Sequence, residues 1–320
     1  KPSGGFSKEA VVRILKNVVL VFSSGYILFY FSELLFWARV RPNDNLAGWL
    51  MTWLAYSLLT FAFLWLVSRY HISSFWPLFL AGACFGWLAE GLLVQTTYED
   101  LPLSISFTGL AWHALLSVGL GWGLLPASLG GRPRRSIWIA ALTGLGYGLW
   151  AICWWLEPDG GVSSLPQFAL HAFISAALYL PACFLLKWSA SEPFHPSRGL
   201  TIAVGLLYLV YFLLVTLPAA PVALLLLPAL LGLAWLGLRG TARRANGPTM
   251  LETLAEPVRP GRYLALLALP VAATVVYAAA LALDLKWQTN WLLYLITTPA
   301  GFILFITAWV KSRRMAKTPG

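Results

Sequence analysis

Four ionisable side chains lie inside long apolar stretches of the sequence. They are two carboxylates and two imidazoles: Glu33, Glu90, His113 and His171. A charged residue at the centre of a membrane helix costs about 2.5–3.5 kcal/mol on insertion scales. An ionisable residue in such a place is therefore, by default, a candidate functional group.

Three of these residues have the side chains of an acid–base centre. A carboxylate and imidazoles that are buried together can exchange protons at neutral pH. We predict that Glu90 is the base that activates water, and that His113 and His171 either stabilise an oxyanion or, with Glu90, hold a divalent metal ion. The predicted supporting residues are Glu33, Tyr98, Trp112, Glu157 and Asp159.

Two other interpretations of the same side chains stay open. In one, the two glutamates and two histidines are hydrogen-bonding partners that fix the register of neighbouring helices and have no chemical role. In the other, Glu90 is the proton or cation site of a transporter, or the histidines ligate a haem or a metal ion.

The order of the three catalytic candidates resembles that of the CPBP intramembrane proteases, the relatives of the CAAX proteases. That family has the motifs Glu-Glu-x-x-x-Arg, Phe-x-x-x-His and His-x-x-x-Asn. The corresponding stretches of this chain are 89–94, 109–113 and 171–175. They keep Glu90, His113 and His171 but lack the first Glu, the Arg, the Phe and the Asn. The resemblance implies Glu and His chemistry within membrane helices.

Composition indicates which elements must position these residues. Of the 320 residues, 59% are hydrophobic and 11% are charged, whereas a soluble protein is about 25% charged. A membrane-spanning helix needs about 20 mostly apolar residues. Ten windows qualify, namely 15–37, 47–68, 75–97, 107–128, 137–156, 167–188, 200–217, 220–238, 262–283 and 290–310. We predict an all-α polytopic membrane protein with a single transmembrane domain over 1–320 and no soluble domain.

The basic residues predict the orientation of these spans. All but three of the 22 Lys and Arg residues fall on one side, and Arg39, Arg41 and Lys286 fall on the other. The positive-inside rule then places both termini in the cytoplasm, and we expect a bacterial cytoplasmic (inner) membrane. Because topology accounts for the net charge of +10, we expect the lipid bilayer as partner and no nucleic acid.

The same topology places the four ionisable residues at one level of the membrane. At about 1.5 Å per residue, each lies roughly 6–10 Å from the outer end of its window. The outer loops add six carboxylates: Asp44, Glu99, Asp100, Glu157, Asp159 and Asp284. We therefore predict a polar layer beneath an acidic extracytoplasmic rim.

Neighbouring windows share a pattern that we interpret as a direct repeat of helical hairpins. The clearest motifs are Gly82-x-x-x-Gly86 and Gly144-x-x-x-Gly148. The first is followed by Glu90, an acidic loop and His113, and the second by an acidic loop and His171; the first two windows offer a fainter copy with Glu33. Such glycine pairs allow helix backbones to approach closely.

These features favour an intramembrane enzyme, either a hydrolase or a lipid- or isoprenoid-modifying enzyme. Its Glu/His/His site would open to the extracytoplasmic side and take an apolar or lipid-like ligand. The alternatives are a proton-coupled transporter of a small solute and a non-catalytic subunit of a larger membrane complex. The chain is rich in Trp (17 residues), which favours membrane-interface anchors. Its cysteines, Cys84, Cys153 and Cys183, lie on different spans and predict neither a disulfide framework nor a zinc site.

Overall fold

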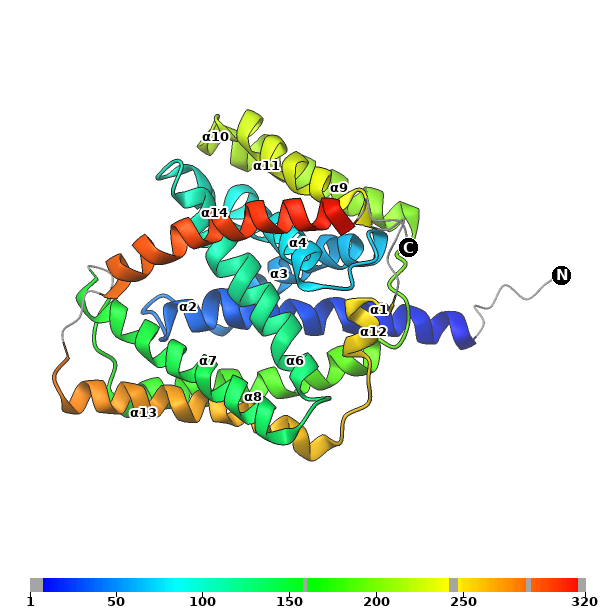
Figure 1. The fold of residues 1–320 in the computed structure, drawn as a ribbon. Helices are drawn as coiled ribbons and strands as arrows, with labels where there is room; N and C mark the ends of the chain where they lie inside the picture. Colours follow the sequence, from blue (N-terminus) through cyan, green and yellow to red (C-terminus); the bar gives the residue numbers. More distant parts are fainter. Residues whose placement is uncertain (1–7, 158–159, 242–246, 286–288, 316–320) are drawn as a thin grey trace.

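The protein is a bundle of helices (Figure 1). A computed structural model describes residues 8–157, 160–241, 247–285 and 289–315, and every regular element within these ranges is a helix. Nine helical segments of the described chain are long and apolar enough to cross a membrane. The predicted all-α polytopic membrane class is therefore confirmed.

The bounds of the elements follow the predicted windows closely. In chain order they are α1 (Lys8–Phe29), η1 (Tyr30–Leu34), α2 (Leu35–Trp37), α3 (Leu46–Arg69), α4 (Phe75–Leu88), η2 (Ala89–Leu93), η3 (Thr96–Tyr98), α5 (Ser104–Ser106), η4 (Phe107–Leu124), α6 (Leu125–Ser128), α7 (Pro133–Cys153), η5 (Trp154–Leu156), α8 (Leu165–Ser189), α9 (Arg198–Tyr211), η6 (Phe212–Thr216), α10 (Leu217–Ala219), α11 (Ala223–Leu238), α12 (Met250–Leu254), η8 (Pro260–Leu267), α13 (Ala268–Ala282) and α14 (Thr289–Met315).

The eighth predicted window gives a shorter helix than the other nine. Pro218 lies in α10 and Pro221 lies in the turn before α11, so α11 begins only at Ala223 and has 16 residues. At 1.5 Å per residue it is about 24 Å long, less than the roughly 30 Å of a hydrocarbon core. It packs against α4 and α14. The start of α1 and the end of α14 lie at the same end of the bundle (Figure 1), which fits an even number of crossings once α11 is counted.

The glycine pair of α4 brings that helix close to η4. A Cβ atom at Gly82 would lie 3.0 Å from the Ala114 Cα, and one at Gly86 would collide with the backbone of Gly109. The predicted close approach is thus confirmed for this pair. It places His113 opposite the segment that follows α4.

The second glycine pair has a different partner from the one that the hairpin repeat suggests. Gly144 meets the backbone of Leu269, and Gly148 meets Ala273 and Val276, all of which belong to α13. Figure 1 shows α13 running beside α7 and α8, and it packs along both. In contrast, α1 packs directly on α3, and α4 packs directly on η4.

Wide π-type backbone occurs at the predicted polar layer. It forms the short interruptions η1 and η2, which carry Glu33 and Glu90, a further one at η6, and the whole of the 18-residue η4, which carries His113. A π-type turn inside a helix is uncommon and is often found at a functional site. Three of the four ionisable residues singled out by the sequence therefore lie on unusual backbone.

Candidate functional site

Glu90 and His113 form the centre of the polar layer. The His113 Nε2 atom lies 2.6 Å from Glu90 Oε1, across the contact between η2 and η4. The His113 side chain is 2% exposed and that of Glu90 is 12% exposed. The pairing of these two residues agrees with their predicted common depth.

The second ring nitrogen of His113 is hydrogen-bonded to a pair of serines in the core. His113 Nδ1 lies 2.9 Å from Ser32 Oγ, and Ser32 donates to Ser117 Oγ at 2.9 Å. Both serines are buried. With the Ser32 proton directed to Ser117, Nδ1 acts as the donor to Ser32. Both ring nitrogens of His113 are therefore engaged, and Glu90, His113, Ser32 and Ser117 form one continuous polar chain.

Glu90 is also held by hydroxyl groups on the side away from His113. Its Oε2 atom accepts a hydrogen bond from Thr96 Oγ1, and the Thr108 side chain is a further hydrogen-bonding neighbour. Thr96 and Thr108 both line a cavity. Glu90 therefore lies directly behind the wall of that cavity. Ser32 and Ser117 lie at the other end of the polar chain, farther from the cavity.

Glu33 lies beside this polar chain and, like Glu90, is hydrogen-bonded by an aromatic ring. Tyr56 donates to its Oε1 atom at 2.8 Å, and Trp37 Nε1 donates to Oε2 at 3.2 Å. The rings of Tyr56 and His113 have centroids 6.4 Å apart. Two carboxylates, each held by a ring from the next long helix, are thus neighbours within the layer.

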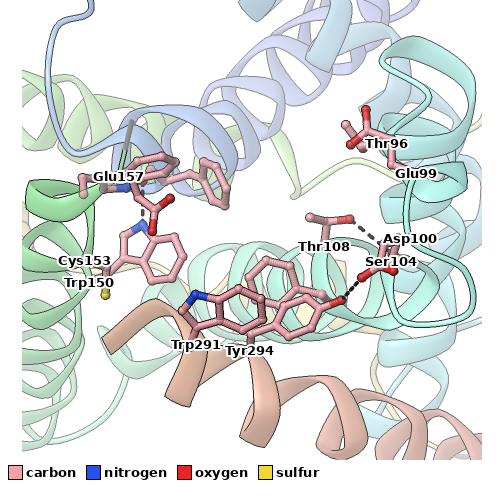
Figure 2. Close-up of a pocket in the computed structure, with 13 residues that line it drawn as sticks. Thr96, Glu99, Asp100, Ser104, Thr108, Trp150, Cys153, Glu157, Trp291 and Tyr294 are labelled. Atoms are coloured by element: carbon pink, nitrogen blue, oxygen red, sulfur yellow. Dashed lines mark hydrogen bonds between the residues drawn. The ribbon is translucent and has the colours of Figure 1, made fainter. Parts of the chain in front are cut away.

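The cavity next to Glu90 has a volume of about 420 Å³ (Figure 2). Its walls come from α2, the 94–104 connection, the start of η4, the end of α7 with η5, and the start of α14. It is lined by Phe36, Thr96, Glu99, Asp100, Ser104, Phe107, Thr108, Trp150, Cys153, Trp154, Glu157, Trp291 and Tyr294. Figure 2 shows Glu157 on one side, Glu99 and Asp100 on the opposite side, and the α14 rings between them.

Two of the other predicted supporting residues, Trp112 and Tyr98, lie close to residues that line this cavity. Trp112 stands behind the wall, where its ring packs on Phe36 and Trp150 at centroid distances of 4.9 and 4.7 Å. Tyr98 donates to the Gly91 carbonyl at 2.9 Å, and burial raises its pKa to about 12, so it stays a neutral donor. Asp159 lies outside the described residues.

His171 is separated from the Glu90–His113 pair. Its Nε2 atom lies 2.9 Å from the Leu34 carbonyl oxygen, and the side chain is buried at the edge of a second hollow. This hollow is an apolar groove of about 780 Å³ between α1, α3 and α8, with Arg39 at the same end as His171. The predicted three-residue centre is therefore reduced to two residues, because α8 presents its histidine to η1 instead of η4.

The described residues form no cluster of three or more His, Cys, Asp and Glu side chains that could hold a metal ion. Two of the three predicted metal ligands, Glu90 and His113, are neighbours. The carboxylate oxygens of Glu90 and both ring nitrogens of His113 already have protein partners.

The sequence interpretation missed the hydroxyl groups of the site and its α14 wall. Ser32, Ser117 and Thr96 are common residue types in membrane helices, and only their spacing gives a signal. Ser32 directly precedes Glu33, and Ser117 follows His113 by four residues, which is one helical turn. Nothing in the spacing indicates that Trp291 and Tyr294 reach the same cavity from the last helix.

Comparisons of the chain with protein-family models, curated proteins and solved structures found no match. The resemblance to the CPBP proteases therefore receives no support from the family models.

Proposed function

We propose that the protein is an intramembrane enzyme that uses Glu90 and His113 for general acid–base catalysis on a substrate bound in the neighbouring cavity. The observation that carries the proposal is the 2.6 Å contact between His113 Nε2 and Glu90 Oε1, directly behind the cavity wall. A base oriented by a second hydrogen-bonded group is the usual arrangement for proton transfer in enzymes.

In the proposed step, Glu90 accepts a proton from a water molecule or a substrate hydroxyl in the cavity. The oxygen attacks an electrophilic centre of the substrate and forms a new bond, while the bond to the leaving group breaks. The proton then passes to the leaving group. His113 lends or takes up a proton during this exchange, and Ser32 keeps the imidazole in place from its Nδ1 side.

A proton-coupled transporter of a small solute is the second candidate. It is favoured by the carboxylates that line the cavity, Glu99, Asp100 and Glu157, because they form an acidic path from the surface towards Glu90. In such a transporter a cationic solute and a proton would compete for Glu90.

We further propose a bacterial cytoplasmic membrane, cytoplasmic termini and a lipid-like occupant for the groove at His171. The excess of Lys and Arg on one side of the predicted spans supports the orientation. The apolar groove wall, made largely by Val18, Phe22, Leu170 and Ile174 with their neighbours, supports an acyl or isoprenoid chain. The bilayer is then the principal partner, and protein partners are left open.

The enzyme proposal is tested with proteoliposomes that contain the wild type or the Glu90→Gln variant. They are incubated with phospholipids, isoprenoid phosphates and hydrophobic peptides, and the products are measured by mass spectrometry. We expect a conversion that Glu90→Gln slows at least about 100-fold, the usual contribution of general acid–base catalysis. Glu33→Gln is the matched control, since it makes the same chemical change in the same layer, and we expect less than a tenfold effect.

Two results would contradict the enzyme proposal. One is a folded Glu90→Gln variant that keeps every conversion of the wild type. The other is a wild type that converts none of these substrates but accumulates a solute when a pH gradient is imposed. If Glu90→Gln abolishes that accumulation, the transporter is the correct assignment.

A further inference from the structure

The cavity beside Glu90 is distinguished by its aromatic walls. Six of its thirteen lining residues are aromatic, and they fall into two groups. Phe107, Trp291 and Tyr294 come from η4 and α14, with ring centroids of Phe107 and Tyr294 4.7 Å apart. The other group comes from α2, the end of α7 and the start of η5, where Phe36 lies 5.4 Å from Trp150 and 5.5 Å from Trp154. An aromatic ring attracts a cation over its face.

The polar groups of the cavity are mainly acceptors. Trp150 and Trp154 both donate their indole N–H to the Phe36 carbonyl, at 2.6 and 2.7 Å, so a ligand meets their ring faces instead of their N–H groups. The hydroxyl groups of the cavity also donate to acceptors of the protein. Tyr294 donates to Asp100 at 2.7 Å and Ser104 donates to the Thr97 carbonyl at 2.7 Å.

The two threonines complete this pattern. Thr96 donates to Glu90, and Thr108 lies 3.5 Å from the Ser104 carbonyl oxygen. An anion in the cavity would need N–H or O–H donors, but these hydroxyls already have protein acceptors. A ligand that brings its own positive charge meets carboxylate oxygens and ring faces instead.

The charges around the cavity also favour a positively charged ligand. Glu99, Asp100 and Glu157 line it, and its thirteen described lining residues include no Lys, Arg or His. The carboxylates stand on two opposite sides (Figure 2), so a cation between them is attracted from both. A hollow lined by one sign of charge also raises the local concentration of the opposite ion.

From this combination we infer that the cavity binds an organic cation, an amine or quaternary ammonium group attached to an apolar body. An inorganic cation would gain little from six aromatic rings, and a neutral apolar ligand would gain nothing from three carboxylates. The volume of about 420 Å³ lies in the range of small-molecule sites. As the substrate class of the Glu90–His113 centre, this inference rests on the proposed function; as a statement about binding, it stands on the cavity alone.

The test compares two probes of the same shape on the full chain in nanodiscs. They are (3-hydroxyphenyl)trimethylammonium and 3-tert-butylphenol, which differ in charge and little else. Isothermal titration calorimetry, corrected with empty nanodiscs, gives the two dissociation constants. We expect the cation to bind at least tenfold more tightly than its neutral counterpart, and increasing salt to weaken only the cation. Equal dissociation constants would overturn the inference.

Variants at exposed positions locate the binding site. Glu99 and Trp291 are both exposed, so Glu99→Gln and Trp291→Leu should fold normally. Each should raise the dissociation constant of the cation about two- to fivefold, as expected for one partly solvated carboxylate or ring. Glu9→Gln, an exposed change near the start of α1, is the matched control. Unchanged binding by both cavity variants would contradict the assignment of the site.

Two further experiments are needed. One distinguishes a lipid headgroup from a free amine as the source of the cation, and the other distinguishes the enzyme proposal from the binding inference. Nanodiscs with phosphatidylcholine added to phosphatidylglycerol should weaken probe binding if a lipid headgroup is the natural ligand, and should leave it unchanged if the ligand is a free amine; either result keeps the cation class. Cation binding without any Glu90-dependent conversion would contradict the enzyme and keep the inference. Glu90-dependent conversion without cation binding would support the enzyme and contradict the inference.

Discussion

Glu33 and Glu90 occupy matching places in two successive helical hairpins. Each lies on a π-type turn near the end of the first helix, and each is bonded by a ring from the second, Tyr56 in one hairpin and His113 in the other. The difference between the two rings matters for chemistry. Phenol is a poor proton acceptor at neutral pH, whereas imidazole accepts and donates near pH 7. The same architecture thus gives a structural pair and a pair suited to proton exchange.

The Glu33–Tyr56 pair should act mainly on stability. Tyr56→Phe keeps the ring but leaves Glu33 Oε1 without its 2.8 Å donor. Loss of one hydrogen bond to a buried acceptor costs about 1–3 kcal/mol, so we expect a lower thermal midpoint in detergent. The Glu90-dependent activity should fall less than tenfold. A fall of 100-fold or more with an unchanged midpoint would show that Tyr56 takes part in the chemistry.

The two membrane histidines should differ in their effect on activity. His113→Gln removes the imidazole that contacts Glu90 and should lower the rate at least about 100-fold. His171→Gln changes a side chain that is bonded to the Leu34 carbonyl instead, and we expect less than a tenfold loss. Steady-state rates of both variants in the same proteoliposomes provide the measurement. Equal losses would restore the three-residue centre that the sequence suggests.

The contact between α7 and α13 can be tested with a pair of glycines two residues apart. A Cβ at Gly144 would collide with the Leu269 backbone, whereas one at Gly146 would meet no atom within 4 Å. Gly144→Ala should therefore destabilise the protein by about 1–3 kcal/mol through overpacking. Gly146→Ala should be neutral or stabilise it by up to about 1 kcal/mol, the difference in helix propensity. Equal thermal midpoints for the two variants would show that the helices do not meet at Gly144.

The loop after α2 should give the protein a small acid-sensitive component of stability. Burial acts to raise the Asp44 pKa, but the hydrogen bonds and charge of Arg41 outweigh it, and the pKa lies below its ordinary value of 3.8. A carboxyl with a lowered pKa in the folded state stabilises it above the unfolded-state pKa, and this contribution is lost as the pH falls through the folded-state pKa.

Asp44→Asn isolates that component. Above about pH 5 the wild type should be the more stable by no more than about 1 kcal/mol, since the Arg41–Asp44 pair is partly solvated. The difference should shrink as the pH falls below about 4. Thermal midpoints of both proteins from pH 3 to pH 8 provide the test. A difference that grows with acidity would reverse the sign and contradict the assignment.

The sequence predicted the spans well because one physical requirement dominates them. About 20 apolar residues are needed to cross the hydrocarbon, and nine windows became long helices with ends within a few residues of those expected, apart from the start of α1. The eighth, α11, came out short because Pro221 and Val222 form a turn at the beginning of the predicted window. The shared depth of Glu90 and His113 followed from counting residues at 1.5 Å each.

The direction of each side chain around its helix could not be predicted in the same way. Depth is a single coordinate, whereas contact also depends on helix rotation and on which helices are neighbours. The place of α13 beside α7 and α8 is a long-range packing outcome, and so is the contact of His171 with Leu34. Ser32 and Ser117 were overlooked because a serine alone is a weak signal.

The π-type turns let these helices carry an extra residue without turning the rest of the helix. A wide turn accommodates one residue more than an α-turn, so the deletion of one residue within 30–34 would let an unbroken α-helix form. Because the turn absorbs the extra residue locally, the helix beyond it would keep its rotation, and Phe36, whose carbonyl accepts both indole N–H groups at the aromatic wall, would keep its place. Glu33, which lies in the turn itself, would change its position relative to Tyr56. In related chains, a gap of one residue at this point would therefore mark a changed Glu33 pair beside an unchanged aromatic wall.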